Sequence, residues 1–245
     1  MTRASVYLMG GGWNEAAYPR TYGRFAAAAS KSGQARIACV ILDGEDREMH
    51  YGWAAHAFSI VGVRETYPVY VSGADPLLWN QLEGATGIFV GGGLTPAYHD
   101  AMVPSAASWL PGLVERGVPY AGISAGAMIA ADRAIVAGWK LKRGDTDHAI
   151  CSEELAEEAD QLDIRSGLGL APFAVDTHAS HYGSPTRVMH AVNAGLVDEG
   201  WAIDEETMIE LIDGVPRVRG LGVAYRIRRS GGSLKVDIAA DDGAD

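Results

Sequence analysis

The chain has few cysteines, no long apolar run and comparatively little positive charge. Its two cysteines, Cys39 and Cys151, lie far apart in the sequence, which excludes a disulfide framework and a cysteine metal site. No stretch approaches the ~18 consecutive apolar residues of a membrane-spanning helix. The first apolar run is also too short for the core of a signal peptide. We therefore expect a cytoplasmic protein with no metal and no cofactor.

Acidic residues outnumber basic residues, 31 against 20, and give a formal net charge of −11. The most basic stretch, Lys140 to Arg143, contains only three positive charges. An acidic surface repels the phosphates of nucleic acids and of anionic membranes, so neither is an expected partner. We expect a small peptide or acyl compound as the ligand. A homodimer is one assembly that the sequence leaves open.

Short apolar runs that end in glycine or turn residues are abundant, and they alternate with helical patterns. This alternation is typical of an α/β fold, here a three-layer, doubly wound and mostly parallel sheet with helices on both faces. We expect one domain over residues 1–240, closed by hairpins, and a disordered tail at 241–245. The predicted strands are residues 6–9, 36–42, 66–71, 87–90 and 120–123.

Two stripes of apolar residues with a spacing of about four residues predict helices that face the core. The stripes are Tyr18, Tyr22, Phe25 and Ala29, then Met49, Trp53, Ala57 and Val61. Further on, the acidic segment 153–163 is predicted to form a surface helix.

A later helix is predicted to begin at Pro185, because proline suits the first helical turn. The residues that it is predicted to bury are Val188, Val192 and Leu196. The dipeptides Asp213-Gly214 and Gly231-Gly232 each separate two apolar runs and predict hairpins with type I′ turns.

A Gly-x-Ser-x-Gly pattern at residues 122–126 contains the candidate nucleophile, Ser124. The pattern alone is common by chance, but here it follows an apolar run and precedes a helix-forming segment. That setting predicts the strand-to-helix turn on which serine hydrolases present their nucleophile. Glycines suit both flanking positions because a Cβ there would clash or block the substrate. The alternative interpretation is a structural glycine-rich turn.

Backbone amides near Ser124 are candidate donors to an oxyanion. The amide of Ala125 lies at the start of the predicted helix. Gly92 and Gly93 follow the neighbouring predicted strand, and parallel strands end at the same edge of a sheet. The alternative interpretation of the glycine runs at residues 91–93 and 10–12 is a phosphate-binding loop. Neither run completes a Gly-x-Gly-x-x-Gly motif.

Sequence position separates the seven histidines as candidates for the general base. His50 and His56 are predicted to lie in a helix away from the strand ends, and His190 is predicted to lie inside the late helix. His99 is predicted to start a helix, and His148 lies in the acidic loop region. His178 and His181 follow a strand-like segment at 172–175, and His178 comes directly at its end. The carboxylate that orients the base stays open among Asp145, Asp147, Asp204 and Glu205.

Together these motifs resemble the serine peptidases that include cyanophycinase and the aspartyl dipeptidase called dipeptidase E, which have a class I glutamine amidotransferase-like fold. The similar segments are Tyr7–Gly12, Gly87–Gly93, Gly122–Ala127, Gly167–Leu170, Val175–His178 and Ala202–Thr207. The resemblance implies a triad of Ser124, His178 and Glu205, an acyl-enzyme, and cleavage of a small peptide or isopeptide bond beside an aspartyl residue. The residues then expected around the substrate are Asp176, Thr177, Leu94 and Arg187.

The chain departs from this family where the substrate is expected to bind. Cyanophycinases have several arginines soon after the histidine, whereas this chain has only Arg187 in that segment, and Leu94 stands where an Asn or Asp is usual. We expect Arg187 either to bind a substrate carboxylate or to cap the late helix at the surface. Two other functions stay open: an amidase or esterase on a non-peptide acyl compound, and a non-catalytic relative that binds a metabolite.

Overall fold

The central element of the fold is a seven-stranded sheet with the order β13-β12-β1-β5-β4-β2-β3. The structure is a computed structural model that describes residues 4–243. Five neighbouring strands are parallel: β1 (Ser5–Met9), β5 (Tyr120–Ile123), β4 (Gly87–Val90), β2 (Arg36–Leu42) and β3 (Glu65–Val71). These strands are the five predicted from the sequence, to within one residue at each end. The predicted fold class is therefore confirmed.

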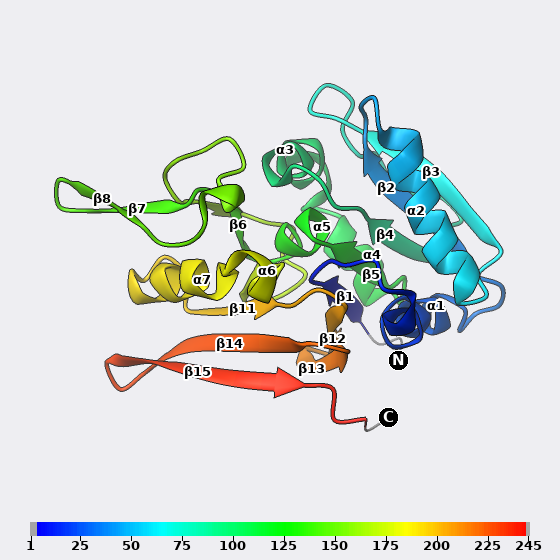
Figure 1. The fold of residues 1–245 in the computed structure, drawn as a ribbon. Coiled ribbons are helices and arrows are strands. Elements are labelled where there is room, and N and C mark those ends of the chain that lie inside the picture. Colours follow the sequence, from blue (N-terminus) through cyan, green and yellow to red (C-terminus); the bar gives the residue numbers. More distant parts are fainter. Residues whose placement is uncertain (1–3, 244–245) are drawn as a thin grey trace.

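Helices cover both faces of this sheet, and the strands β1, β4 and β5 at its centre are buried along their whole length (Figure 1). On one face lie η1 (Glu15–Arg20), α1 (Tyr22–Ala29) and α2 (Arg47–Ile60), and Tyr7 and Met9 of β1 point into their core. On the other face lie α3 (Thr95–Ala106) and α4 (Leu110–Glu115), which pack with Val6 and Leu8. A short turn, η2 (Trp79–Leu82), precedes β4.

The two predicted apolar stripes have different outcomes. All four residues of the first stripe are buried in the core on η1 and α1, as predicted. In the second stripe Ala57 is buried, but Met49 is 44% exposed and Trp53 is 42% exposed. The buried face of α2 consists of Ala54, Ala57 and Phe58, so the prediction was wrong about the direction in which Met49 and Trp53 point.

The C-terminal part of the chain builds a second sheet of four strands, β10 (Ala174–Asp176), β11 (Glu199–Ile203), β14 (Val223–Ser230) and β15 (Ser233–Ala240). Its core is shared with α7 (Ser184–Asn193), which has Pro185 in its first turn and buries Val188 and Val192. Leu196 lies beyond the helix end and is exposed, so its predicted burial is wrong.

The chain returns to the central sheet through β12 (Thr207–Ile212), which pairs antiparallel with β1, and β13 (Val215–Gly220). Both predicted hairpin turns are present. The central residues Asp213, Gly214, Gly231 and Gly232 all have positive φ, as a type I′ turn requires. The predicted disordered tail does not fit Asp241, whose carboxylate accepts hydrogen bonds from Arg219 and Gly220, while residues 244 and 245 lie outside the described part.

Residues 133–166 form two small antiparallel pairs beside the main sheets (Figure 1). β6 (Arg133–Ala137) pairs with β9 (Asp163–Ser166), and β7 (Lys140–Arg143) pairs with β8 (Thr146–Ala149). The surface helix predicted at 153–163 is wrong, because only the 3-10 turn η3 (Glu153–Leu155) forms there. Glu157 and Glu158 have φ of 47° and 71°, and a right-handed helix cannot continue through such residues. Within residues 4–243, no helix is both long and apolar enough to cross a membrane.

Candidate active site

Ser124 lies at the sharp turn between β5 and α5 (Ala125–Met128), with φ 52° and ψ −118°. Residues with a Cβ rarely adopt this conformation, and such strain concentrates at functional sites. The flanking glycines are required for space. A Cβ on Gly122 would lie 2.3 Å from the Gly126 carbonyl, and a Cβ on Gly126 would lie 2.4 Å from the Val90 oxygen. The Gly-x-Ser-x-Gly pattern therefore has a steric cause.

His178 connects Ser124 to Glu205. Its Nε2 lies 2.9 Å from Ser124 Oγ, and its Nδ1 lies 2.8 Å from Glu205 Oε1. Because a carboxylate can only accept, the neutral imidazole holds its proton on Nδ1 and leaves the Nε2 lone pair for the serine hydroxyl. The structure thus brings together the three residues that the resemblance named as a triad, 54 and 27 positions apart in the chain.

The three side chains come from two different sheets. Ser124 follows β5 of the central sheet, whereas His178 follows β10 and Glu205 follows β11 of the four-stranded sheet. Two backbone hydrogen bonds join the sheets here, from the His178 amide to the Gly10 oxygen (3.0 Å) and from the Glu206 amide to the Gly11 oxygen (2.9 Å).

Gly11 lies directly against the imidazole of His178. It has φ 126°, and a Cβ at this position would lie 2.4 Å from His178 Cε1. Glycine is needed for both the conformation and the close approach. The glycine run after β1 is therefore explained by contact with His178 and Glu206, without a phosphate group.

The three backbone amides predicted as oxyanion donors belong to Ala125, directly after Ser124, and to Gly92 and Gly93 in the loop after β4. Ala125 is the first residue of α5, and Gly92 is so close that a Cβ on it would lie 3.2 Å from Ser124 Cβ. Gly93 follows Gly92 in the loop after β4. In the part of the chain that the structure describes, none of these three amides donates to another protein group. They are available to an oxyanion that forms beside Ser124.

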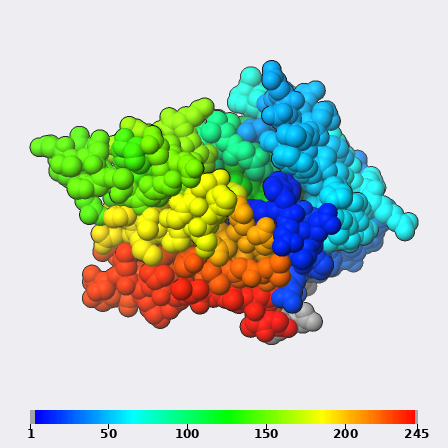
Figure 2. All heavy atoms as spheres, in the orientation of Figure 1, coloured from blue at the N-terminus to red at the C-terminus, as the bar shows by residue number. Residues whose placement is uncertain are grey.

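A pocket of about 230 Å³ opens beside Ser124 and His178. Its inner wall contains the buried side chains of Ile41, Phe89 and Ile123, at the carboxyl ends of β2, β4 and β5. Figure 2 shows this face of the molecule, where the dark-blue segment after β1 lies between the light-blue surface of α2 and the yellow and orange surface of the later residues.

Three aromatic residues at this pocket were missed by the sequence analysis: Trp13, His50 and Trp53. The prediction that His50 lies away from the strand ends is wrong, because α2 presents His50 and Trp53 toward the pocket. Trp13 is 52% exposed. The one signal in the sequence was the position of Trp13 directly after a glycine run that ends a strand.

The predicted substrate contacts from Arg187 and Asp176 are wrong. Arg187 has no exposed surface and donates to both carboxylate oxygens of Asp176, with each distance 2.7 Å. Its remaining nitrogen, Nη1, donates to the backbone oxygens of Gly138 and Leu155. Arg187 therefore neither binds a substrate carboxylate nor caps α7 at the surface.

The other two predicted contacts, Thr177 and Leu94, also lie outside the pocket lining. Thr177 is buried, and its hydroxyl lies 3.5 Å from Met128 Sδ. Leu94 is the half-buried residue before α3. The carboxylate of Glu157, from a different segment, lies at the first turn of that helix. It accepts hydrogen bonds from the Thr95 amide and, at 2.8 Å, from the Thr95 hydroxyl. Burial raises the pKa of Glu157 above its ordinary value.

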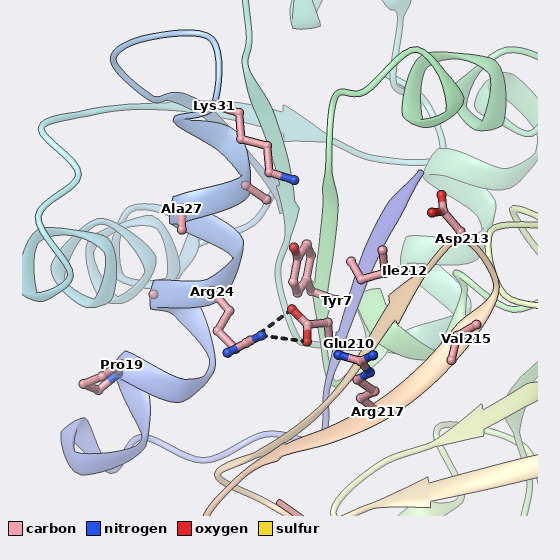
Figure 3. A pocket seen from close by; sticks show the side chains of 12 residues that line it. Tyr7, Pro19, Arg24, Ala27, Lys31, Glu210, Ile212, Asp213, Val215 and Arg217 are labelled. Atoms are coloured by element: carbon pink, nitrogen blue, oxygen red, sulfur yellow. Dashed lines mark hydrogen bonds and ion pairs between the residues drawn. The ribbon is translucent and has the colours of Figure 1, made fainter. Parts of the chain in front are cut away.

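A larger hollow of about 600 Å³ lies between α1 and the strands β12 and β13 (Figure 3). Its polar floor is an ion pair in which Arg24 donates to both oxygens of Glu210, at 3.0 and 3.1 Å. Burial raises the pKa of Tyr7 in this hollow to about 12. The hollow shares no lining residue with the pocket beside Ser124, so it is a separate feature. Across residues 4–243, no group of three or more His, Cys, Asp or Glu is placed to hold a metal ion.

Comparison with known proteins gives the family. The model of peptidase family S51 matches residues 72–218, which is more than half of the chain and includes Ser124, His178 and Glu205. The chain belongs to peptidase family S51. This membership makes it a serine peptidase and confirms the resemblance that the sequence motifs indicated.

The fold of this S51 peptidase is shared with a solved structure of a peptidase from an acI-B1 actinobacterium. The two are 15% identical with a TM-score of 0.65, over 98% of this chain and 95% of the other. At this identity the likeness describes the fold. A search of curated proteins found no match to the chain.

Proposed function

We propose that this serine peptidase cleaves small peptides through a triad of Ser124, His178 and Glu205. The observation that carries the proposal is the continuous line of hydrogen bonds from Ser124 Oγ through His178 to Glu205, with distances of 2.9 and 2.8 Å. Nucleophilic catalysis requires a base within hydrogen-bond distance of the nucleophile and a third group that orients the base.

In the acylation step Ser124 Oγ attacks the carbonyl carbon of the scissile bond, and His178 Nε2 takes the hydroxyl proton. Negative charge develops on the carbonyl oxygen, where the amides of Ala125 and of Gly92 or Gly93 stabilise it. The C–N bond then breaks, His178 gives its proton to the leaving amine, and the acyl group stays on Ser124 as an ester. Glu205 stabilises the imidazolium throughout and keeps the ring in orientation.

In the deacylation step a water molecule takes the place of the amine. His178 Nε2 accepts a proton from the water as its oxygen attacks the ester carbonyl. Collapse of the second tetrahedral intermediate breaks the bond to Ser124 Oγ, which receives the proton back from His178. The products are a carboxylic acid and the free enzyme, so no external cofactor takes part in the step.

The pocket beside Ser124 does not favour the aspartyl preference expected from the resemblance. Among the described residues that line the pocket there is no Lys or Arg, and Arg187, the one arginine expected to bind a substrate carboxylate, is buried against Asp176. The same triad also supports hydrolysis of a simple ester or amide, which is the second candidate function. Rates on matched peptide and ester substrates separate the two.

A fluorophosphonate probe tests the nucleophile directly. We expect the probe to label the native chain on the peptide that contains Ser124 and to leave the Ser124→Ala variant unlabelled. Ser180→Ala is a matched control, because Ser180 is an exposed serine two residues after His178 and its hydroxyl is not part of the hydrogen-bonded line. Equal labelling of the native chain and Ser124→Ala would overturn the proposal.

A further inference from the structure

We propose that the pocket formed by Trp13, His50 and Trp53 binds an apolar or aromatic side chain next to the scissile bond. The peptidase would then select hydrophobic peptides and discriminate against acidic ones. This inference rests on the proposed function, because it names the substrate class of the same site.

The aromatic rings form a connected wall of the pocket that Ser124 and His178 also line. The Trp13 and Trp53 ring centroids are 5.1 Å apart, and the His50 ring stacks on Trp53 at 5.1 Å with an interplanar angle of 27°. The inner wall is apolar, with Ile41 and Phe89. A side chain that enters from Ser124 therefore meets the aromatic rings of Trp13, His50 and Trp53 and an apolar inner wall.

Both tryptophans are about half exposed, although burial of an indole side chain is strongly favourable. They are not isolated, since they lie against each other and next to the nucleophile. A contiguous exposed apolar patch on a folded chain is typical of a binding site. A ligand side chain placed between these rings would remove their surface from water, and the hydrophobic effect would drive its binding.

The charges around the pocket disfavour an acidic side chain. No Lys or Arg is present among the described residues that line it. The amide at the start of α3, two residues after Gly93, is already bound to the carboxylate of Glu157. A substrate carboxylate that entered the pocket would lose its hydration without a Lys or Arg with which to pair, which is unfavourable.

The volume of the pocket sets the size of the side chain. A dry apolar cavity of ~150 Å³ is sufficient to bind benzene. The volume of about 230 Å³ beside Ser124 therefore accommodates one aromatic ring or one branched aliphatic side chain. Phenylalanine and leucine fit this description, and alanine would leave most of the pocket unfilled.

The test uses short peptides that are identical except at the residue on either side of the cleaved bond, which is Phe, Leu, Ala, Asp or Lys. We expect kcat/KM for Phe or Leu at one of these two positions to exceed the values for Ala, Asp and Lys by about tenfold or more, since a few methylene groups in a hydrophobic pocket give discrimination of this order. Preference for Asp or Lys would overturn the inference.

Variants on α2 locate the preference. We expect Trp53→Ala to reduce the ratio of Phe to Ala rates toward one, and Trp53→Lys to raise the relative rate on Asp. Met49→Ala is the matched control, because Met49 is an exposed apolar residue of the same helix that does not line the pocket. An unchanged ratio in Trp53→Ala, with an unchanged melting temperature, would overturn the assignment of Trp53.

A binding measurement separates this inference from the proposed catalysis. The Ser124→Ala variant is titrated with the amides of N-acetylphenylalanine and N-acetylaspartate, and tryptophan fluorescence is followed. We expect at least about tenfold tighter binding of the phenylalanine compound. Equal binding of the two would overturn the inference alone, whereas absent probe labelling of native Ser124 would overturn the proposed function.

Discussion

Arg187 and Asp176 form a bidentate ion pair in which neither side chain is exposed to solvent. Nε and Nη2 of the arginine each lie 2.7 Å from a carboxylate oxygen. Asp176 is two residues before His178 and also accepts a hydrogen bond from the Thr177 amide. The pair therefore joins α7 to the end of the strand that positions the base.

Removal of the arginine should be strongly destabilising. We expect Arg187→Met to lower the free energy of unfolding by ~3–5 kcal/mol, because it leaves the carboxylate of Asp176 buried without a partner. Urea denaturation followed by circular dichroism measures the change. The matched control is Arg226→Met, which breaks a bidentate but partly exposed ion pair with Glu199. It should lower the free energy of unfolding by ~0.2–1 kcal/mol. Similar losses in the two variants would contradict the expected importance of burial.

Gly11→Ala should lower activity through His178. The added Cβ would lie 2.4 Å from His178 Cε1, so the ring must move away from Ser124. A displacement of ~1 Å at a reacting group lowers the rate by ~100-fold, and we expect kcat/KM to fall by at least this factor. Gly33→Ala is the control, since Gly33 also has positive φ but has no atom within 4 Å of the added Cβ. This control should lose stability and keep its activity.

Glu205→Gln should slow turnover while the fold is preserved. The amide cannot stabilise the imidazolium as a carboxylate does, and kcat should fall by ~10⁴-fold. Asp204→Asn tests the neighbouring carboxylate, which accepts hydrogen bonds from the amides of Ser180 and Val223, whereas His178 Nδ1 is bonded to Glu205. If kcat falls equally in both variants, Glu205 is not the specific partner of the base.

Glu157 should give stability a defined pH dependence. Burial raises the pKa of its carboxyl above the ordinary value of 4.5, so the folded state holds the proton more tightly than the unfolded state. The contribution of Glu157 to the free energy of unfolding is therefore greatest below pH 4.5 and falls as the pH rises through the folded-state pKa.

Urea denaturation between about pH 4 and pH 8 measures this effect as the stability of the native chain minus that of Glu157→Gln. The difference should decrease as the pH rises and then become constant. Glu158→Gln, at the exposed next position, provides the control and should give a difference that changes little with pH. A difference that increases with pH would show that ionised Glu157 is favoured in the folded state.

The parts of the fold that depend on local sequence could be predicted. The five parallel strands and the Ser124 turn follow from apolar runs and from glycines that no other residue can replace sterically. The hairpin turns have the same local origin. His178 also followed from its position at a strand end, whereas Glu205 could be selected from its neighbours only through the resemblance to a family.

The features that depend on long-range packing were not predictable from the pattern. Apolar spacing on α2 fits a face with Met49 and Trp53 as well as the true face with Ala54 and Phe58, and only the packing against the sheet decides between them. For Arg187 the sequence predicted either a contact with a substrate carboxylate or a surface cap of the helix, because its true partner, Asp176, belongs to another element. The segment at Glu157, where φ is positive, likewise makes its side-chain contact with Thr95, which is remote in sequence.

The division of the triad between two sheets has a consequence for control of the rate. Ser124 follows β5 of the central sheet, while His178 and Glu205 follow strands of the four-stranded sheet, and two backbone hydrogen bonds at Gly10 and Gly11 join the chain segments at this point. A small rotation at this junction would separate nucleophile and base without altering either side chain. The 2.9 Å approach of His178 Nε2 to Ser124 Oγ therefore depends on how the two sheets pack as well as on the two side chains themselves.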